Sequence, residues 1–317
     1  MEKRDVVKAW LGQIRSNFLV LSVMLVAVGL ALAAVHIKRT GEGSFSVVDA
    51  ILIMIGVVIA HASVNLFNEY SDSQTGIDNH TQKTPFSGGT GLIQAGVTTP
   101  VAVNTAAWQT IVWTFLIGLY FTMTSHWVIA IIMLIGGLSI IFYTQHLAKV
   151  LLGEFFAGLS LGSLVVVGAF AAMVGRPGMD ACSLFPIEVI LISIPPGILT
   201  ALLLFLNEFP DADVDRKFGR FHLVIWLGRK KASYLYVFGL LMTYVTILLP
   251  PLLGVSSWWV MLGFLTLPIA VRAGMTALKY PEDMQKLVPA MGQNVIVVLA
   301  TDFLLAVGLV LELIFSV

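Results

Sequence analysis

Two short stretches of this sequence repeat one polar pattern, Asn-Glu-aromatic-x-Asp, and each follows a long apolar run. They are FNEYSD, which begins at Phe67, and LNEFPD, which begins at Leu206. Several members of each surrounding cluster recur at helical spacing, which would place them on one face of a helix. Seven of the eighteen Asp and Glu residues belong to these clusters. The clusters comprise Asn65, Asn68, Glu69, Asp72 and Asp78, and Asn207, Glu208, Asp211, Asp213 and Asp215.

The chemistry that suits these side chains is the binding of a magnesium diphosphate. Carboxylate and amide oxygens are hard ligands, and Mg²⁺ typically binds through one or two carboxylates together with water and substrate phosphate. A metal held between two acidic helix ends would stabilise the charge that develops on a departing diphosphate. Lys83, Arg216, Lys217 and Arg220 follow the clusters closely, and we expect them to reach phosphate oxygens. The glycine-rich loop at residues 87–91 suits a segment that folds over a ligand.

The elements that carry these clusters are expected to be transmembrane helices. Of the 317 residues 58% are hydrophobic and only 11% are charged, whereas soluble domains carry about a quarter charged residues. The formal net charge is zero, and without a basic tail or charge block the chain offers little to nucleic acid. The single cysteine, Cys182, excludes an internal disulfide. The composition predicts an all-α protein of the cell membrane that does not bind nucleic acid.

Nine windows are apolar enough to span a bilayer, which needs roughly 20 residues per helix. With nine spans and a cytoplasmic N-terminus, fifteen of the eighteen Lys and Arg residues lie inside, and only Lys38, Arg39 and Arg176 lie outside. This excess follows the positive-inside rule and puts both acidic clusters on the cytoplasmic side. We expect one integral domain over residues 1–317. The windows are 17–36, 47–67, 102–123, 127–143, 151–174, 186–206, 233–250, 257–276 and 292–315.

The motifs of this sequence resemble those of a known family. NEYSDSQTGID, SGGTGLIQAG and NEFPDADVDRKFGRFHLVIWLGRKKA are similar to the two aspartate-rich motifs of the UbiA superfamily of intramembrane prenyltransferases. The five residues between Asp72 and Asp78, and the segment with Tyr143 and Gly153-Glu154, resemble the MenA branch, which prenylates 1,4-dihydroxy-2-naphthoate in menaquinone synthesis. Glu69 stands where Asp is usual, and Glu208 stands where that branch often has Asn.

The resemblance implies a bundle of about nine helices around a central cavity that binds a polyprenyl diphosphate, an aromatic acceptor and Mg²⁺. Departure of the diphosphate leaves an allylic cation, which the acceptor attacks at carbon. The catalytic residues would be Asp72, Asp211 and Asp215. The metal would be held by Asn68, Glu69, Asp72, Asp78, Asn207, Asp211 and Asp215. The substrate contacts would be Asn65, Asn68, Lys83, Asn207, Arg216, Lys217, Tyr143 and Lys149.

A different class of protein also fits a duplicated acidic motif, namely a transporter built from repeats with a cation site. Such sites lie near the bilayer midplane, whereas these clusters lie at helix ends, which favours the enzyme. The six histidines show no metal-ligand spacing, and we interpret them as structural. Asp302 in the last span has two interpretations, a residue of the cavity wall or a helix–helix hydrogen bond, and the second is at least as well supported. Prenyl chain length, the acceptor and the oligomeric state are left open.

Overall fold

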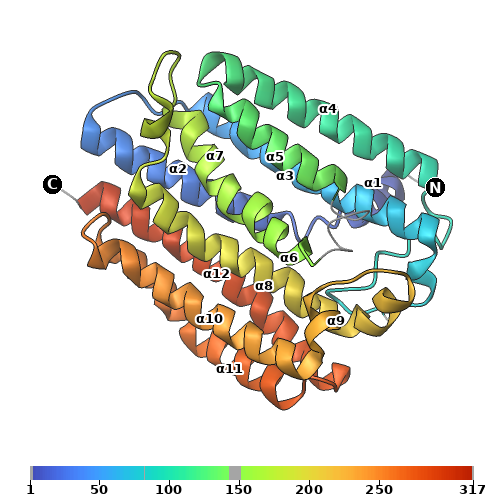
Figure 1. Ribbon diagram of the computed structural model, residues 1–317. Coiled ribbons are helices and arrows are strands. Elements are labelled where there is room, and N and C mark those ends of the chain that lie inside the picture. The colour runs from blue at the N-terminus through green and yellow to red at the C-terminus, as the bar shows by residue number, and fades with distance from the viewer. Residues whose placement is uncertain (1–2, 82, 143–150, 316–317) are drawn as a thin grey trace.

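The computed structural model describes residues 3–81, 83–142 and 151–315, and these fold into a bundle of helices with no strand among them. The long helices lie roughly side by side in Figure 1. Two short 3₁₀ turns, η1 (Ile77–Asn79) and η4 (Ala181–Leu184), lie between them. The principal elements are α1 (Lys3–Gln13), α2 (Val20–Thr40), α3 (Val47–Thr75), α4 (Pro100–Thr124), α5 (Val128–Phe142), α6 (Gly153–Phe156), the π-helical η3 (Ala157–Ser163), α7 (Leu164–Val174), α8 (Ile187–Lys217), α9 (Leu223–Leu227), α10 (Arg229–Leu252), the 3₁₀ segment η5 (Trp258–Thr266), α11 (Leu267–Lys279) and α12 (Met284–Phe315).

The predicted spans agree with these helices. Within the described residues, eight helical stretches are long and apolar enough to cross a membrane, with α6, η3 and α7 forming one stretch and η5 and α11 another. The shorter apolar helix α5 matches the fourth predicted window. The two motif helices extend beyond their apolar windows, α3 to Thr75 and α8 to Lys217. The helix therefore continues past Pro210, as the spacing of the second cluster required.

Local sequence explains where the motif helices end. Ser46 caps the start of α3 by accepting a hydrogen bond from the Asp49 N–H at 3.2 Å. At the other end Gly76 adopts φ +72°, and its N–H bonds to the carbonyl oxygen of Asp72, as expected of a left-handed glycine cap. The chain then turns into η1, which carries Asp78.

The end of α8 has a Schellman cap. The Arg220 N–H bonds to the Asp215 carbonyl at 2.9 Å, the Gly219 N–H bonds to the Arg216 carbonyl at 3.3 Å, and Gly219 has φ +80°. This pair of bonds reverses the chain after a helix. Arg220 is thereby turned back towards the last turns of α8.

Small residues bring α8 against η3. A Cβ added at Gly158 would lie 2.6 Å from the Gly197 carbonyl oxygen, and one added at Gly162 would lie 2.6 Å from the Gly197 Cα. Glycine at these positions lets two helix backbones approach directly, as is common in membrane helix packing. The contact fixes α6 and η3 beside the middle and end of α8.

Candidate active site

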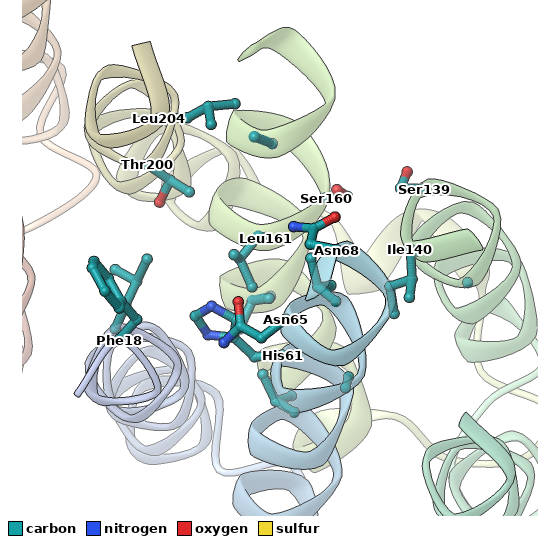
Figure 2. A pocket seen from close by; sticks show the side chains of 18 of the residues that line it. Phe18, His61, Asn65, Asn68, Ser139, Ile140, Ser160, Leu161, Thr200 and Leu204 are labelled. Carbon is teal, nitrogen blue, oxygen red and sulfur yellow. The ribbon is translucent and has the colours of Figure 1, made fainter. Parts of the chain in front are cut away.

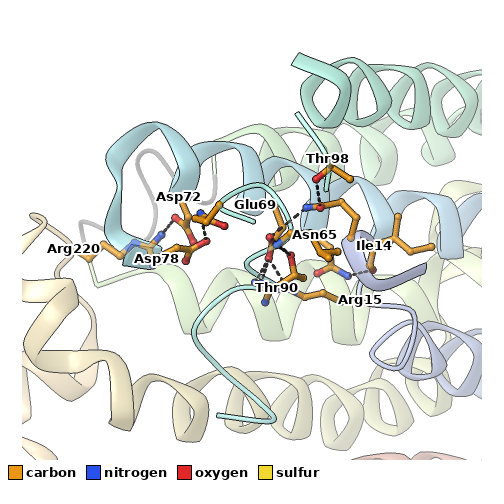
Figure 3. Close-up of polar contacts among 12 residues, drawn as sticks. Ile14, Arg15, Asn65, Glu69, Asp72, Asp78, Thr90, Thr98 and Arg220 are labelled. Atoms are coloured by element: carbon orange, nitrogen blue, oxygen red, sulfur yellow. Dashed lines mark hydrogen bonds and ion pairs between the residues drawn. The ribbon is translucent and has the colours of Figure 1, made fainter. Parts of the chain in front are cut away.

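The two acidic motifs meet at one end of the bundle, where α3 and α8 end. Arg220 forms ion pairs with Asp72 of the first motif and with Asp215 of the second, the latter at 3.1 Å. Both carboxylates are buried. Figure 3 shows Arg220 reaching Asp72, with Asp78 close by. One guanidinium thus neutralises part of the charge that the two helix ends bring together.

Asp78 lies beside this pair on the turn after α3 and is 7% exposed. Gln94 donates to its Oδ2 at 3.3 Å. The backbone of the glycine-rich loop is also close, since a Cβ added at Gly89 would lie 2.5 to 2.7 Å from the Asp78 carboxylate. Burial raises the pKa of Asp78 to about 6, and the carboxylates of Asp72 and Glu69 add to the rise. The ionised form of Asp78 is therefore destabilised in the free protein, and a cation beside the carboxylate would stabilise it.

On α8 the second motif presents oxygen atoms that the protein itself does not satisfy. The Oδ1 atoms of Asn207 and Asp211 are buried and have no hydrogen-bond partner among the described residues. Buried polar atoms in native proteins are nearly always paired. Hard oxygen acceptors left open opposite a second acidic motif fit a Mg²⁺ ion with a bound diphosphate.

Glu69, which the sequence predicts as a metal ligand, is held by protein groups in the structure. Its side chain is 1% exposed. Arg15 binds Oε1 at 2.6 Å, Gln13 donates to Oε2 at 3.3 Å, and Thr90 donates through its N–H at 3.0 Å and its hydroxyl at 2.6 Å. Both carboxylate oxygens are thus used by protein groups (Figure 3), which favours a role in holding the glycine-rich loop and the segment before α2.

A cavity of about 820 Å³ begins at the acidic cluster and continues between the helices. Its walls beyond the polar end are mostly apolar and come from α2, α3, α4, α5, η3, α7 and α8. Figure 2 shows His61, Asn65 and Asn68 in succession on α3, opposite Thr200 and Leu204 on α8. The expected site residues that line this cavity are Asn65, Asn68, Asp72, Asp78, Asn207, Asp211 and Asp215.

Three of the predicted basic residues lie away from the cavity. Lys83, Arg216 and Lys217 are exposed and do not line this cavity. Arg216 donates to the Ile225 carbonyl at 3.0 Å, and the Lys83 Nζ lies against Gly91 of the glycine-rich loop. Tyr143 and Lys149 lie outside the described residues. The Asn65 amide donates to the Ile14 carbonyl at 2.8 Å, which ties α3 to the segment after α1.

Three residues on the cavity wall, Arg15, His61 and His222, were not predicted as site residues. Arg15 lines the cavity together with Arg220, which was expected near phosphate from its position in the sequence. His61 lines it from α3 and is hydrogen-bonded to Ser22 at 2.8 Å, and His222 lies next to Glu208 and Asp215. The sequence marks Arg15, His61 and His222 only as polar residues within or close to apolar runs.

Comparisons with known proteins agree with this architecture. A 1,4-dihydroxy-2-naphthoate octaprenyltransferase from Bacillus subtilis is 28% identical over 318 residues, covering 96% of this chain and 94% of that protein. The apo structure of a UbiA homolog from Aeropyrum pernix K1 superimposes with a TM-score of 0.69 at 17% identity, covering 93% of this chain and 98% of the other.

A UbiA homolog from Archaeoglobus fulgidus, solved bound to DMAPP and Mg²⁺, superimposes with a TM-score of 0.53 at 13% identity, covering 94% of this chain and 99% of the other. These structures share the fold of the bundle described above. The model of the UbiA prenyltransferase family matches residues 22–294, which include both acidic motifs and every long helix around the cavity. The chain belongs to the UbiA prenyltransferase family.

Proposed function

We propose that this protein transfers a polyprenyl group from an allylic diphosphate to an aromatic acceptor, 1,4-dihydroxy-2-naphthoate or a related quinone precursor, in a Mg²⁺-dependent reaction. The observation that carries the proposal is the convergence of both acidic motifs at the head of one largely apolar cavity. The naphthoate acceptor is supported by the Bacillus subtilis relative, and Mg²⁺ with an allylic diphosphate by the Archaeoglobus fulgidus structure.

The acidic end would hold the metal diphosphate. When bound there, Mg²⁺ supplies positive charge that stabilises the departing diphosphate. Arg220, on the cavity wall, is within reach of the same region and can donate to phosphate oxygens. The residues that would hold the ion are Asn68, Asp72, Asp78, Asn207, Asp211 and Asp215.

The apolar part of the cavity would hold the prenyl chain and exclude water from the allylic cation. Some of its wall residues on α4 and α5 are themselves exposed, including Phe115 at 51% and Leu134 at 61%. The cavity therefore extends to the lipid-facing surface, which suits a substrate dissolved in the membrane. In the reaction the bond from C1 of the prenyl group to diphosphate breaks, a bond from C1 to a ring carbon forms, and that carbon loses its proton or, where it carries the carboxylate, CO₂.

We also infer that the whole chain is one integral domain of the cell membrane, with the acidic end facing the cytoplasm. The loops at that end carry most of the Lys and Arg residues, whereas Lys38, Arg39 and Arg176 lie at the other end. This distribution supports the orientation through the positive-inside rule.

The test is a product assay on purified protein with geranylgeranyl diphosphate and 1,4-dihydroxy-2-naphthoate, with Mg²⁺ or with EDTA. We expect diphosphate release and a prenylated product, by mass, only with Mg²⁺. Asp211→Asn should lower the rate by roughly 100-fold or more, as expected for loss of electrostatic stabilisation at the reacting centre. Asp213→Asn is the matched control, because Asp213 is 74% exposed and paired with Arg229 on the surface.

The outcomes separate the parts of the proposal. Diphosphate release without the naphthoate product would keep the prenyl transfer chemistry and reject this acceptor. The absence of diphosphate release with any allylic diphosphate would reject the prenyltransferase activity and favour the transporter hypothesis. Equal losses in Asp211→Asn and Asp213→Asn would reject the assignment of the second motif.

A further inference from the structure

A second cluster of possible metal ligands lies next to the diphosphate site. It is made by Glu154 at the start of α6, Glu208 on α8 and His222 just before α9. One ligand atom from each lies within 4.8 Å of the other two. Glu154 is 3% exposed and His222 is 2% exposed. Glu208 and His222 line the main cavity.

The packing of α8 against η3 explains why residues so far apart in sequence meet. The Gly158 and Gly197 contact holds these segments backbone to backbone. Glu154 lies one turn before Gly158, so its side chain is brought alongside α8. The Schellman cap of α8 then returns the chain through Arg220 to His222. The cluster is therefore fixed by three separate elements.

Four buried polar atoms of the cluster have no hydrogen-bond partner among the described residues. Glu154 Oε1 accepts a hydrogen bond from the Leu223 N–H at 2.8 Å, but its Oε2 has no hydrogen-bond partner among the described residues. The same holds for Glu208 Oε2 and for both ring nitrogens of His222. The His222 nitrogens lie 3.5 Å from Glu208 Oε2 and 3.3 Å from Asp215 Oδ2, without forming hydrogen bonds there. A buried polar group without a hydrogen-bond partner destabilises the folded protein.

These groups need a metal cation, a proton shared by the two carboxyls, or a charged His222 imidazole between Glu208 and Asp215, and the ligand set favours a metal cation. The nearby Arg220 is already bonded to Asp72 and Asp215. Two carboxylate oxygens and an imidazole nitrogen form a mixed set in which the imidazole suits first-row transition ions better than Mg²⁺. Neighbouring ligands on such an ion are about 3.0 to 3.6 Å apart, from metal–ligand distances of about 2.1 to 2.2 Å. His222 Nδ1 and Glu208 Oε2 already lie at this spacing, 3.5 Å apart, and the three ligand atoms, all within 4.8 Å of one another, would draw together around the ion.

We propose that Glu154, Glu208 and His222 bind one divalent transition-metal ion, separate from the Mg²⁺ that accompanies the diphosphate. The protein supplies three ligands, so this ion binds without substrate, whereas the ions of the acidic motifs share their coordination with the diphosphate. The ion ties the segment that carries Arg220 to α6 and α8. Its role is to position Arg220 and Asp215.

The proposal is tested with metal alone. Purified protein is stripped with chelator, exchanged into metal-free detergent buffer, and titrated with Mn²⁺ by electron paramagnetic resonance and with Zn²⁺ by elemental analysis, in the absence of any diphosphate. We expect one equivalent bound by the wild-type protein. Glu154→Gln and His222→Gln should weaken this binding at least tenfold. Glu154→Gln retains an oxygen for the Leu223 N–H, which guards against misfolding.

Asp72→Asn and Asp211→Asn are the matched controls. These variants should still bind one equivalent of metal in the absence of substrate. They should not bind the additional ions that the wild-type protein binds when an allylic diphosphate is added. Unchanged binding in Glu154→Gln and His222→Gln, with all proteins monodisperse, would overturn the proposal. So would the absence of substrate-independent binding in folded wild-type protein, which would mean that the two carboxyls share a proton instead. Neither readout uses prenyl transfer, so failure here is distinct from failure of the proposed activity.

Discussion

Asp72 and Asp215, one from each acidic motif, are bridged by a single guanidinium, that of Arg220. The two carboxylates come from helix ends that the sequence separates by more than a hundred residues. Arg220 reaches both only because the chain reverses at Gly219. In the absence of bound metal this arginine supplies the positive charge that the acidic cluster requires.

Arg220→Gln should therefore impair both the fold of the site and substrate binding. We expect kcat/KM to fall by at least roughly tenfold, the scale of one charge-assisted hydrogen bond, and the melting temperature of the metal-free protein to fall as well. Arg216→Gln is the control, since Arg216 is exposed and its side chain donates to the backbone carbonyl of Ile225. Steady-state kinetics and thermal melting would check both. Equal kinetics for the two variants would contradict the role given to Arg220.

The contrast between these arginines shows what the sequence can and cannot predict. Arg216 follows Asp215 directly, but neighbours on a helix point in directions about 100° apart. Arg216 therefore leaves the face that carries the acidic residues. Arg220 lies further along the chain, yet the Schellman cap returns it to that face. Proximity in sequence predicted a basic residue at the site but could not say which one.

The helices themselves were largely predictable. Apolar length located the membrane part of each span, because burial in lipid dominates there. It missed the polar last turns of α3 and α8, which are set by glycine caps and side-chain contacts instead. The cluster of Glu154, Glu208 and His222 was not predictable from spacing, since its members come from three elements that meet only through helix packing.

Substitution of Glu69 distinguishes a structural role of this residue from a role in metal binding. In Glu69→Gln the buried carboxylate that receives Arg15 is lost, and breaking such a pair costs about 3 kcal/mol. We expect a lower melting temperature and a higher KM for the prenyl diphosphate. The Mg²⁺ concentration that gives half-maximal activity should stay within about twofold of wild type, because Glu69 is already occupied by protein groups. A large increase in that Mg²⁺ concentration would show that Glu69 is a metal ligand.

The glycine-rich loop is tested by a pair of matched substitutions. Gly89 and Gly96 both adopt φ +68°, so alanine at either position carries the same backbone penalty, about 1 kcal/mol or more. Only at Gly89 would the new Cβ meet a neighbour, the carboxylate of Asp78 at 2.5 to 2.7 Å; at Gly96 nothing lies within 4 Å. Gly89→Ala should lose most activity and Gly96→Ala little. Similar activities would mean that loop contact with Asp78 does not matter for turnover.

The pH dependence of metal binding should reflect Asp78. Because its pKa is raised to about 6 from an ordinary value near 3.9, the folded protein holds this proton more tightly than the unfolded chain. Its contribution to the stability of the metal-free protein therefore falls as pH rises through about 4 to 6. Mg²⁺ binds the ionised form, so the stabilisation by Mg²⁺ and an allylic diphosphate should grow over the same range.

Thermal melting with and without these ligands, from pH 5 to pH 8, measures this difference. Asp78→Asn removes the titrating group and should reduce the growth of the ligand effect between pH 5 and pH 7. An unchanged profile in Asp78→Asn would assign the pH dependence to other carboxyls of the cluster.

The orientation in the membrane can be tested with the protein's own cysteine. Cys182 is exposed and lies on η4, at the end of the bundle opposite the acidic motifs. If that end faces outwards, a membrane-impermeant maleimide should label Cys182 in intact cells, or in spheroplasts where an outer barrier blocks access. A Cys182→Ser protein that carries Gln74→Cys, at an exposed position beside the first motif, should react only after the membrane is opened. The reverse pattern would place both acidic motifs outside, where cytoplasmic prenyl diphosphates could not reach them.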